Sequence, residues 1–300
     1  MTGAPAPDAA RRAAAPGFGA RLVAAVRERG ALCVGIDPHP DLLRAWGLPA
    51  DATGLERFAL STVHALAGTV AVLKPQAAFF EAHGSRGVAV LERTIAEASA
   101  RGAIVVLDVK RGDIGSTMAA YAAAYLTDGS PLAADAVTLS PYLGFASLRP
   151  ALDAASLGGR GVFVLARTSN VDGAAVQTAV VQNGRTVAQS IVDAAAAENA
   201  GARPVGDVGV VIGATAPHGL DLSRLNGPVL APGLGAQGAT AADLWTVFGG
   251  TALLLPSASR DVLRHGPDPM ALRRAADDLL AELRCNWPPK TGTGTAVLPQ

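Results

Sequence analysis

The sequence predicts an α/β fold built as a single (β/α)₈ TIM barrel, and three observations support this prediction. Eight short apolar segments recur along the chain, and helical patterns fill most of the intervals between them. The apolar segments are continuous rather than alternating, as expected for parallel strands that are covered on both faces. Eight such units within about 270 residues fit a closed barrel better than an open doubly wound sheet.

The predicted strands share a run of apolar residues that stops close to a proline or a polar side chain. They cover residues 31–38, 70–75, 103–109, 136–142, 161–168, 208–215, 228–232 and 252–256. In barrels of this kind the carboxyl ends of the strands form the active-site face. Polar residues at these ends are therefore the first candidates for function.

Helices are predicted where apolar residues recur at three- and four-residue spacing. They cover residues 21–29, 55–67, 88–100, 147–155, 187–197, 241–248 and 269–286. Asp268 is placed to cap the last helix, and Pro269 suits its first turn. Strands that alternate with helices imply right-handed βαβ units and a parallel sheet. We expect one barrel domain over residues 17–287, with flexible tails at 1–16 and 288–300.

Composition excludes several classes of partner. The 300 residues include 25 Lys plus Arg and 25 Asp plus Glu, which argues against nucleic acid or an anionic membrane as the main partner. Cys33 and Cys285 are too few for a disulfide framework, and the five histidines lack metal-ligand spacing, so we predict no metal site. No apolar run reaches the roughly 18 residues of a membrane span. We expect a soluble cytoplasmic protein, with an organelle transit peptide as the alternative for the first residues.

The stretch LDVKRGDIGS, residues 107–116, places charged side chains at the end of a buried strand. Residues two apart on a strand share a face, so Asp108 and Lys110 are expected to point the same way. Gly112 allows a turn before Asp113, and Lys74 ends the neighbouring strand. These four ions alternate in sign, and their place at the barrel mouth indicates a catalytic cluster rather than a purely structural salt-bridge network.

The chemistry of Lys110 and a phosphate site narrow the class of substrate. Flanking carboxylates keep this lysine protonated, which suits stabilisation and protonation of a carbanion better than a Schiff base. The loop APGLGAQG, residues 231–238, has G-x-G-x-x-G spacing but follows the seventh strand, where barrels commonly bind phosphate through backbone N–H groups. Arg260, after the eighth strand, is able to bind two phosphate oxygens, although a surface arginine at a helix end is the alternative.

The motif Asp108-x-Lys110-x-x-Asp113-Ile114, followed by Thr117, resembles the signature of the orotidine 5′-phosphate decarboxylase family. The segments VGIDPHPDLL (34–43), LKPQAAFFE (73–81), LARTSN (165–170) and APGLGAQG resemble its longer bacterial branch. The resemblance extends from about residue 31 to residue 260. It implies decarboxylation of orotidine 5′-monophosphate to UMP, the last step of de novo pyrimidine nucleotide synthesis, without a metal or organic cofactor.

The resemblance also implies roles for individual residues. Lys110 matches the proton donor, Asp108 the aspartate near the departing carboxylate, and Lys74 the lysine that pairs with this aspartate and reaches the ribose. Asp113 joins these catalytic candidates. The substrate-binding candidates are Asp37, Thr117, Ser140, Arg167, Gly235, Gln237 and Arg260.

Within that second set, Asp37 matches a contact to ribose and base, and Ser140 a contact to the pyrimidine. Gln237 and Arg260 match contacts to phosphate. Asp113 and Thr117 match residues that the family contributes across a homodimer interface, so we expect shared active sites.

Two other functions stay open from the residues alone. One is a metal-dependent sugar-phosphate decarboxylase or epimerase of the same barrel superfamily, which would place a divalent metal among the carboxylates. Lys74 would occupy space where a metal-binding acid is useful. The other is a non-catalytic nucleotide-binding barrel. Such a protein could have lost its lysine, whereas this chain retains every charged residue named above.

Overall fold

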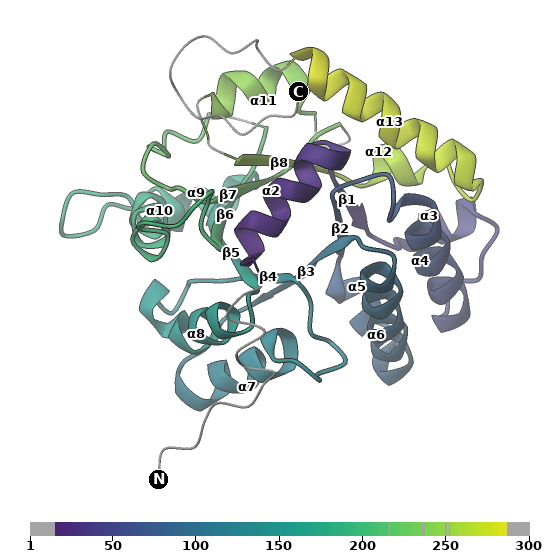
Figure 1. Ribbon diagram of the computed structural model, residues 1–300, viewed down its shortest axis with the longest axis horizontal. Helices are drawn as coiled ribbons and strands as arrows, with labels where there is room; N and C mark the ends of the chain where they lie inside the picture. Colours follow the sequence, from purple (N-terminus) through teal and green to yellow (C-terminus); the bar gives the residue numbers. More distant parts are fainter. Residues whose placement is uncertain (1–15, 216, 236–237, 250, 252, 287–300) are drawn as a thin grey trace.

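The computed structural model describes residues 16–215, 217–235, 238–249, 251 and 253–286. Eight parallel strands close into a barrel in chain order (Figure 1). Their bounds are β1 Cys33–Ile36, β2 Val72–Pro75, β3 Ile104–Arg111, β4 Ala136–Leu139, β5 Gly161–Arg167, β6 Val208–Ile212, β7 Pro228–Pro232 and β8 Leu253–Ala258. The predicted fold class is therefore confirmed.

Helices surround the barrel (Figure 1). The α-helices are α2 Phe18–Arg29, α3 Pro40–Ala45, α4 Ala52–Leu66, α5 Ala77–Glu81, α6 Gly84–Ala100, α7 Gly115–Leu126, α8 Arg149–Leu157, α9 Ala174–Gln177, α10 Val187–Glu198, α11 Ala241–Phe248, α12 Arg260–Leu263 and α13 Pro269–Asn286. Two 3₁₀ turns, η1 Phe145–Leu148 and η2 Val171–Gly173, lie in the loops after β4 and β5.

Five of these helices were not predicted, and α7 is the longest of them. Its sequence, GSTMAAYAAAYL, is apolar or small almost all round, so it lacks the polar face that makes helical spacing visible. The other four, α3, α5, α9 and α12, are four to six residues long, too short to show a period. Asp268 does cap α13, because its Oδ1 accepts from the N–H of Met270 at 2.9 Å.

Helix α2 closes the amino-terminal end of the barrel and lies across the strands in Figure 1. Its Phe18 is fully buried and packs edge-on against Phe163 of β5, with ring centroids 5.8 Å apart. Gly161 makes this possible, since a Cβ there would lie 2.2 Å from a ring carbon of Phe18. Burial of the apolar face of α2 therefore seals this end of the barrel.

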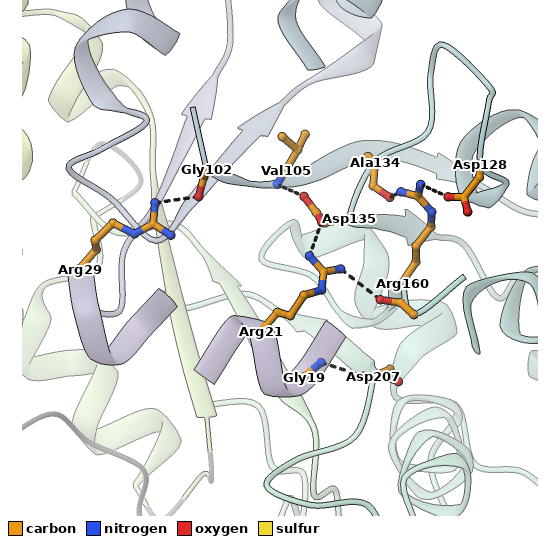
Figure 2. Close-up of polar contacts among 11 residues, drawn as sticks. Gly19, Arg21, Arg29, Gly102, Val105, Asp128, Ala134, Asp135, Arg160 and Asp207 are labelled. Atoms are coloured by element: carbon orange, nitrogen blue, oxygen red, sulfur yellow. Dashed lines mark hydrogen bonds and ion pairs between the residues drawn. The ribbon is translucent and has the colours of Figure 1, made fainter. Parts of the chain in front are cut away.

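Polar contacts fasten the same helix to the strands, as Figure 2 shows. Asp135, directly before β4, accepts from Nη1 of Arg21 at 2.5 Å and from the N–H of Val105 in β3 at 2.9 Å. Asp207, directly before β6, accepts from the N–H of Gly19 at 2.7 Å. With this end closed, the carboxyl ends of the strands are left for function. No helix among the described residues combines the length and apolar character of a membrane span.

Candidate active site

A cavity of about 360 Å³ opens at the carboxyl ends of the strands. This volume lies within the range of small-molecule sites, about 300–1,000 Å³. Every strand, or the residue directly after it, contributes to its wall. The strand-end contributors are Asp37, Lys74, Asp108, Thr138, Leu165, Val211, Leu230 and Ser257. The cavity is therefore the barrel mouth that the polar strand ends predict.

Three charged side chains meet in this cavity. Asp108 accepts from Nζ of Lys110 at 2.6 Å on Oδ1 and from Nζ of Lys74 at 3.0 Å on Oδ2. Asp108 and Lys74 are buried, whereas the side chain of Lys110 is 44% exposed towards the cavity. A buried carboxylate is thus compensated on both oxygens, and one of its two cations remains accessible to a ligand.

These contacts keep the buried pair Asp108 and Lys74 ionised. Burial by itself raises the pKa of Asp108, but the positive charges of Lys74 and Lys110 lower it well below its usual range. Burial by itself lowers the pKa of Lys74, but the negative charges of Asp108 and Asp37 raise it above its usual range. Asp108 and Lys74 therefore stay charged across the physiological pH range.

Asp113 does not join this set within one chain. Its Oδ1 accepts from the N–H of Ile114 at 2.7 Å, and no ion pair links it to Lys110 in the described part of the chain. The cavity wall does not include it. The expected set of four alternating charges therefore has three members here, because the chain turns away from the mouth after Gly112.

Lys110 is held by unusual backbone geometry. The ladder between β3 and β4 pairs Leu107 with Val137 and then Arg111 with Leu139, so β3 bulges over the residues between. Lys110 has φ of 47°, in the left-handed region that costs a non-glycine residue about 1–2 kcal/mol. Its side chain does lie beside that of Asp108, as expected, but on a bulged strand rather than a regular one.

Asp37 and Arg260 also line the cavity. Oδ1 of Asp37 is buried and has no hydrogen-bond partner among the described residues, which leaves an acceptor for a ligand hydroxyl or N–H. Gly35 lets the carboxylate approach, since a Cβ there would lie 3.1 Å from both of its oxygens. Arg260 is exposed at the start of α12, and no ion pair is found for it within the described ranges.

The glycine-rich loop after β7 borders the same cavity through Gly233 and Leu234. Gly233, Gly235 and Gly238 all have positive φ. At Gly235, where φ is 75°, a Cβ would lie 2.1 Å from Oδ2 of Asp261, so another residue would be strained and would displace that carboxylate. The N–H of Gly235 donates to the carbonyl of Ala239 at 2.8 Å within the loop. Gln237 lies outside the described residues.

Three further candidates lie outside the cavity wall. Thr117 is exposed in the first turn of α7. The N–H of Ser140 donates to the carbonyl of Arg111 at 2.7 Å. Nη1 of Arg167 donates to Oε1 of Gln177 in α9 at 2.9 Å. Each is close to a strand end, but its side chain is not part of the pocket in this structure.

Sequence reasoning missed several residues that do line the cavity. They are His39, Gln76, Thr138, Thr168, Ser169, Asn170, Ser257 and Ser259. Residues 168–170 could have been predicted, because they lie at the end of the fifth predicted strand and directly after it, inside the motif LARTSN. Thr138 was not, because a threonine inside an apolar strand looks like any other strand residue. No group of three His, Cys, Asp or Glu side chains suited to a metal ion occurs in the described ranges.

Comparison with known proteins decides the family. A model of the orotidine 5′-phosphate decarboxylase / HUMPS family matches residues 30–274. The chain belongs to this family. Two relatives named orotidine 5′-phosphate decarboxylase, from Salinispora arenicola and Streptomyces coelicolor, are 62% and 59% identical over 269 and 272 residues. Each alignment covers 89% of this chain and 97% of the relative.

Solved structures agree with this assignment to the decarboxylase family. A crystal structure from Streptomyces avermitilis is 58% identical, with a TM-score of 0.88 over 91% of this chain and 96% of that chain. The OMP decarboxylase of Leishmania donovani is 32% identical, with a TM-score of 0.71 over 90% of this chain and 98% of that one. The barrel therefore has the fold of these two structures, and the alignments span nearly the whole of each solved chain.

Proposed function

We propose that the chain decarboxylates orotidine 5′-monophosphate to UMP in de novo pyrimidine nucleotide synthesis, as a carbon–carbon lyase. The observation that carries this proposal is the Lys74–Asp108–Lys110 set, whose buried carboxylate holds an accessible ammonium group at the barrel mouth. Family membership over nearly the whole barrel supports the same reaction.

The reaction breaks the bond between C6 of the pyrimidine and its carboxylate. The bonding electrons stay on C6, carbon dioxide leaves, and Nζ of Lys110 gives its proton to C6; solvent then reprotonates the lysine. No neighbouring carbonyl delocalises the charge on C6, so the site must lower the barrier by on the order of 20 kcal/mol. A fixed ammonium group directed at the developing charge supplies electrostatic stabilisation without reorganisation.

The other residues of the mouth bind and orient the substrate in this proposal. Asp108 holds Lys110 in place and lies near the departing carboxylate, and Lys74 keeps Asp108 ionised. Asp37 has a free acceptor for the ribose or the base. Arg260 and the loop after β7 bind the phosphate, whose remote binding energy helps to hold the reacting groups together.

A metal-dependent sugar-phosphate reaction is the second candidate, since the family model spans more than one activity. The position of Nζ of Lys74, 3.0 Å from Oδ2 of Asp108, favours the decarboxylase, because the ammonium group occupies the oxygen that a metal would need. The test mixes purified protein with orotidine 5′-monophosphate and follows the fall in ultraviolet absorbance. We expect turnover that survives a chelator. No turnover, or loss of turnover with chelator, would contradict the proposal.

We also infer a homodimer in the cytoplasm whose active sites are shared. Asp113 lies outside its own cavity, and apolar side chains are exposed beside it: Ile114 is 62% exposed and Tyr142 79%. Ile114 follows the end of β3 and Tyr142 the end of the neighbouring strand β4. The two segments lie side by side there, since Gly112 is close to the carbonyl of Ser140. In a two-fold dimer this segment is able to reach the partner's mouth, and symmetry makes the exchange reciprocal.

Mixing two inactive variants tests the shared site. In a dimer of Lys110→Ala and Asp113→Ala chains, one site carries both defects and the other is intact. Random exchange makes half of the dimers mixed, so activity should recover to about a quarter of that of the unmodified protein. A mixture that stays inactive despite proven subunit exchange would show that both residues act within one chain.

A further inference from the structure

A buried hydroxyl group connects the two functional parts of the bulge in β3. Thr138 of β4 is 1% exposed. Its Oγ1 donates to Oδ1 of Asp108 at 2.7 Å and accepts from the backbone N–H of Lys110 at 3.0 Å. Oδ1 of Asp108 is the same oxygen that receives Nζ of Lys110. One hydroxyl group therefore touches both the carboxylate and the backbone of the residue that carries the ammonium group.

The register places Thr138 directly opposite the bulge. The ladder is regular at Val137 and resumes at Leu139, and the bulged residues of β3 lie between these two pairs. Here a side-chain oxygen serves as the acceptor for the N–H of Lys110, at the residue whose φ is 47°. This hydrogen bond is partly buried, and an N–H left unpaired where water has limited access is costly, so the acceptor helps to maintain a conformation that a lysine rarely adopts.

We propose that Thr138 is a positioning residue that fixes both Asp108 and Lys110 for the reaction. This inference rests on the proposed decarboxylase function. Without the hydroxyl group, Asp108 would lose one of its three hydrogen-bond donors and the backbone of Lys110 its acceptor. The ammonium group would then be free to move away from C6, and a displacement of about 1 Å in such a group is able to cost about 100-fold in rate.

The variant Thr138→Val tests the role of the hydroxyl group, because valine has nearly the same shape. We expect kcat to fall about 10- to 100-fold, the range for loss of a hydrogen bond to a charged group. The affinity for UMP, which lacks the reacting carboxylate, should stay within about threefold, since Arg260 and the phosphate loop are untouched. Thr138→Ser should restore kcat to within about threefold of the unmodified protein.

Thr94→Val is the matched control. Thr94 is also fully buried, and its hydroxyl group donates to the carbonyl of Val90 at 2.7 Å in helix α6, away from the cavity. Both valine variants remove one buried hydroxyl group, but kcat should fall only for Thr138→Val; thermal unfolding is measured for both, to show that each is folded under the assay conditions. If that variant does not fold, Thr138→Ser and Thr138→Ala form a second pair that differs only in the hydroxyl group.

The outcomes separate this inference from the proposed function. An unmodified protein without turnover of orotidine 5′-monophosphate would contradict the decarboxylase function itself. An active unmodified protein whose Thr138→Val variant keeps kcat within threefold would overturn the role of Thr138. A serine variant as slow as the valine variant, or UMP binding that weakens as much as kcat, would also overturn it. With the second pair, equal kcat values for serine and alanine would do the same.

Discussion

Replacing Lys110 with methionine removes the ammonium group and nearly preserves the length of the side chain. A unit charge about 4 Å from the developing carbanion is worth about 4 kcal/mol at an effective dielectric constant near 20. Loss of a positioned proton donor costs a further factor of about 10² to 10⁴, or about 3–5 kcal/mol. Together these amount to about 7–9 kcal/mol, and we expect turnover to fall by about 10⁵- to 10⁷-fold.

The fold should tolerate this change. The side chain of Lys110 is 44% exposed, and Asp108 keeps its bonds to Lys74 and Thr138. The free energy of unfolding should therefore change by only about 1 kcal/mol, as for a partly exposed ion pair. The assay is the fall in absorbance of orotidine 5′-monophosphate, with chemical denaturation run in parallel.

Arg111→Met is the control, because it removes a cation one residue further along the strand. Its guanidinium group pairs with Glu81 and lies 5.8 Å from the ring centroid of Tyr121. We expect this variant to keep turnover within about tenfold. A folded Lys110→Met protein with turnover within 100-fold of the unmodified protein would refute the assignment of Lys110 as proton donor and electrostatic stabiliser.

Three further predictions concern the phosphate, the thiols and pH. Arg260→Ala should weaken UMP binding by at least tenfold more than uridine binding in calorimetry, because only UMP has the phosphate dianion; equal weakening would make Arg260 structural. Burial raises the pKa of Cys33 to about 12, so a thiol reagent at pH 8 should modify only the exposed Cys285 in the native protein and both in denaturant; two fast thiols in the native protein would contradict this. Lys74 and Lys110 lower the pKa of Asp108, so its contribution to stability is complete above the unfolded pKa near 4 and is lost as pH falls below it. The unfolding free energy of the unmodified protein, relative to Asp108→Asn, should therefore fall by more than about 1 kcal/mol between pH 6 and pH 3; a constant difference would show that the charge of Asp108 does not stabilise the fold.

The strands were predictable because burial on both faces leaves a direct trace in the sequence. Continuous apolar runs located all eight, and the run at 228–232 has the bounds of β7. The errors lie at strand ends. The prediction extended the fourth strand to residue 142, whereas β4 ends at Leu139 and Tyr142 already lies in a turn. The end of a strand depends on its neighbours, which apolar spacing does not encode.

The charged residues of the site were predictable for a related reason. Asp108 and Lys110 at the end of a buried strand are costly unless each is compensated, so their presence already indicates a site. What the residues alone did not reveal is how they meet. The bulge and the φ of Lys110 depend on the register against β4, and the hydroxyl group of Thr138 acquires its role only through that register.

Asp135, directly before β4, and Thr138 of β4 hold the backbone of β3, one before the bulge and one within it. Asp135 accepts from the N–H of Val105 near the start of β3, beside the contact with α2, and Thr138 accepts from the N–H of Lys110 near its end. A slip of β3 by one residue would turn the apolar side chains of the strand to the wrong face. Asp135 opposes such a slip at the closed end of the barrel, which contributes to stability, and Thr138 sets the geometry at the open end, where the chemistry takes place. The hydrogen bonds from Val105 to Asp135 and from Lys110 to Thr138 therefore fix the backbone of β3 before and at the strained residue. This is why a flexible lysine side chain is able to present its charge in a defined position.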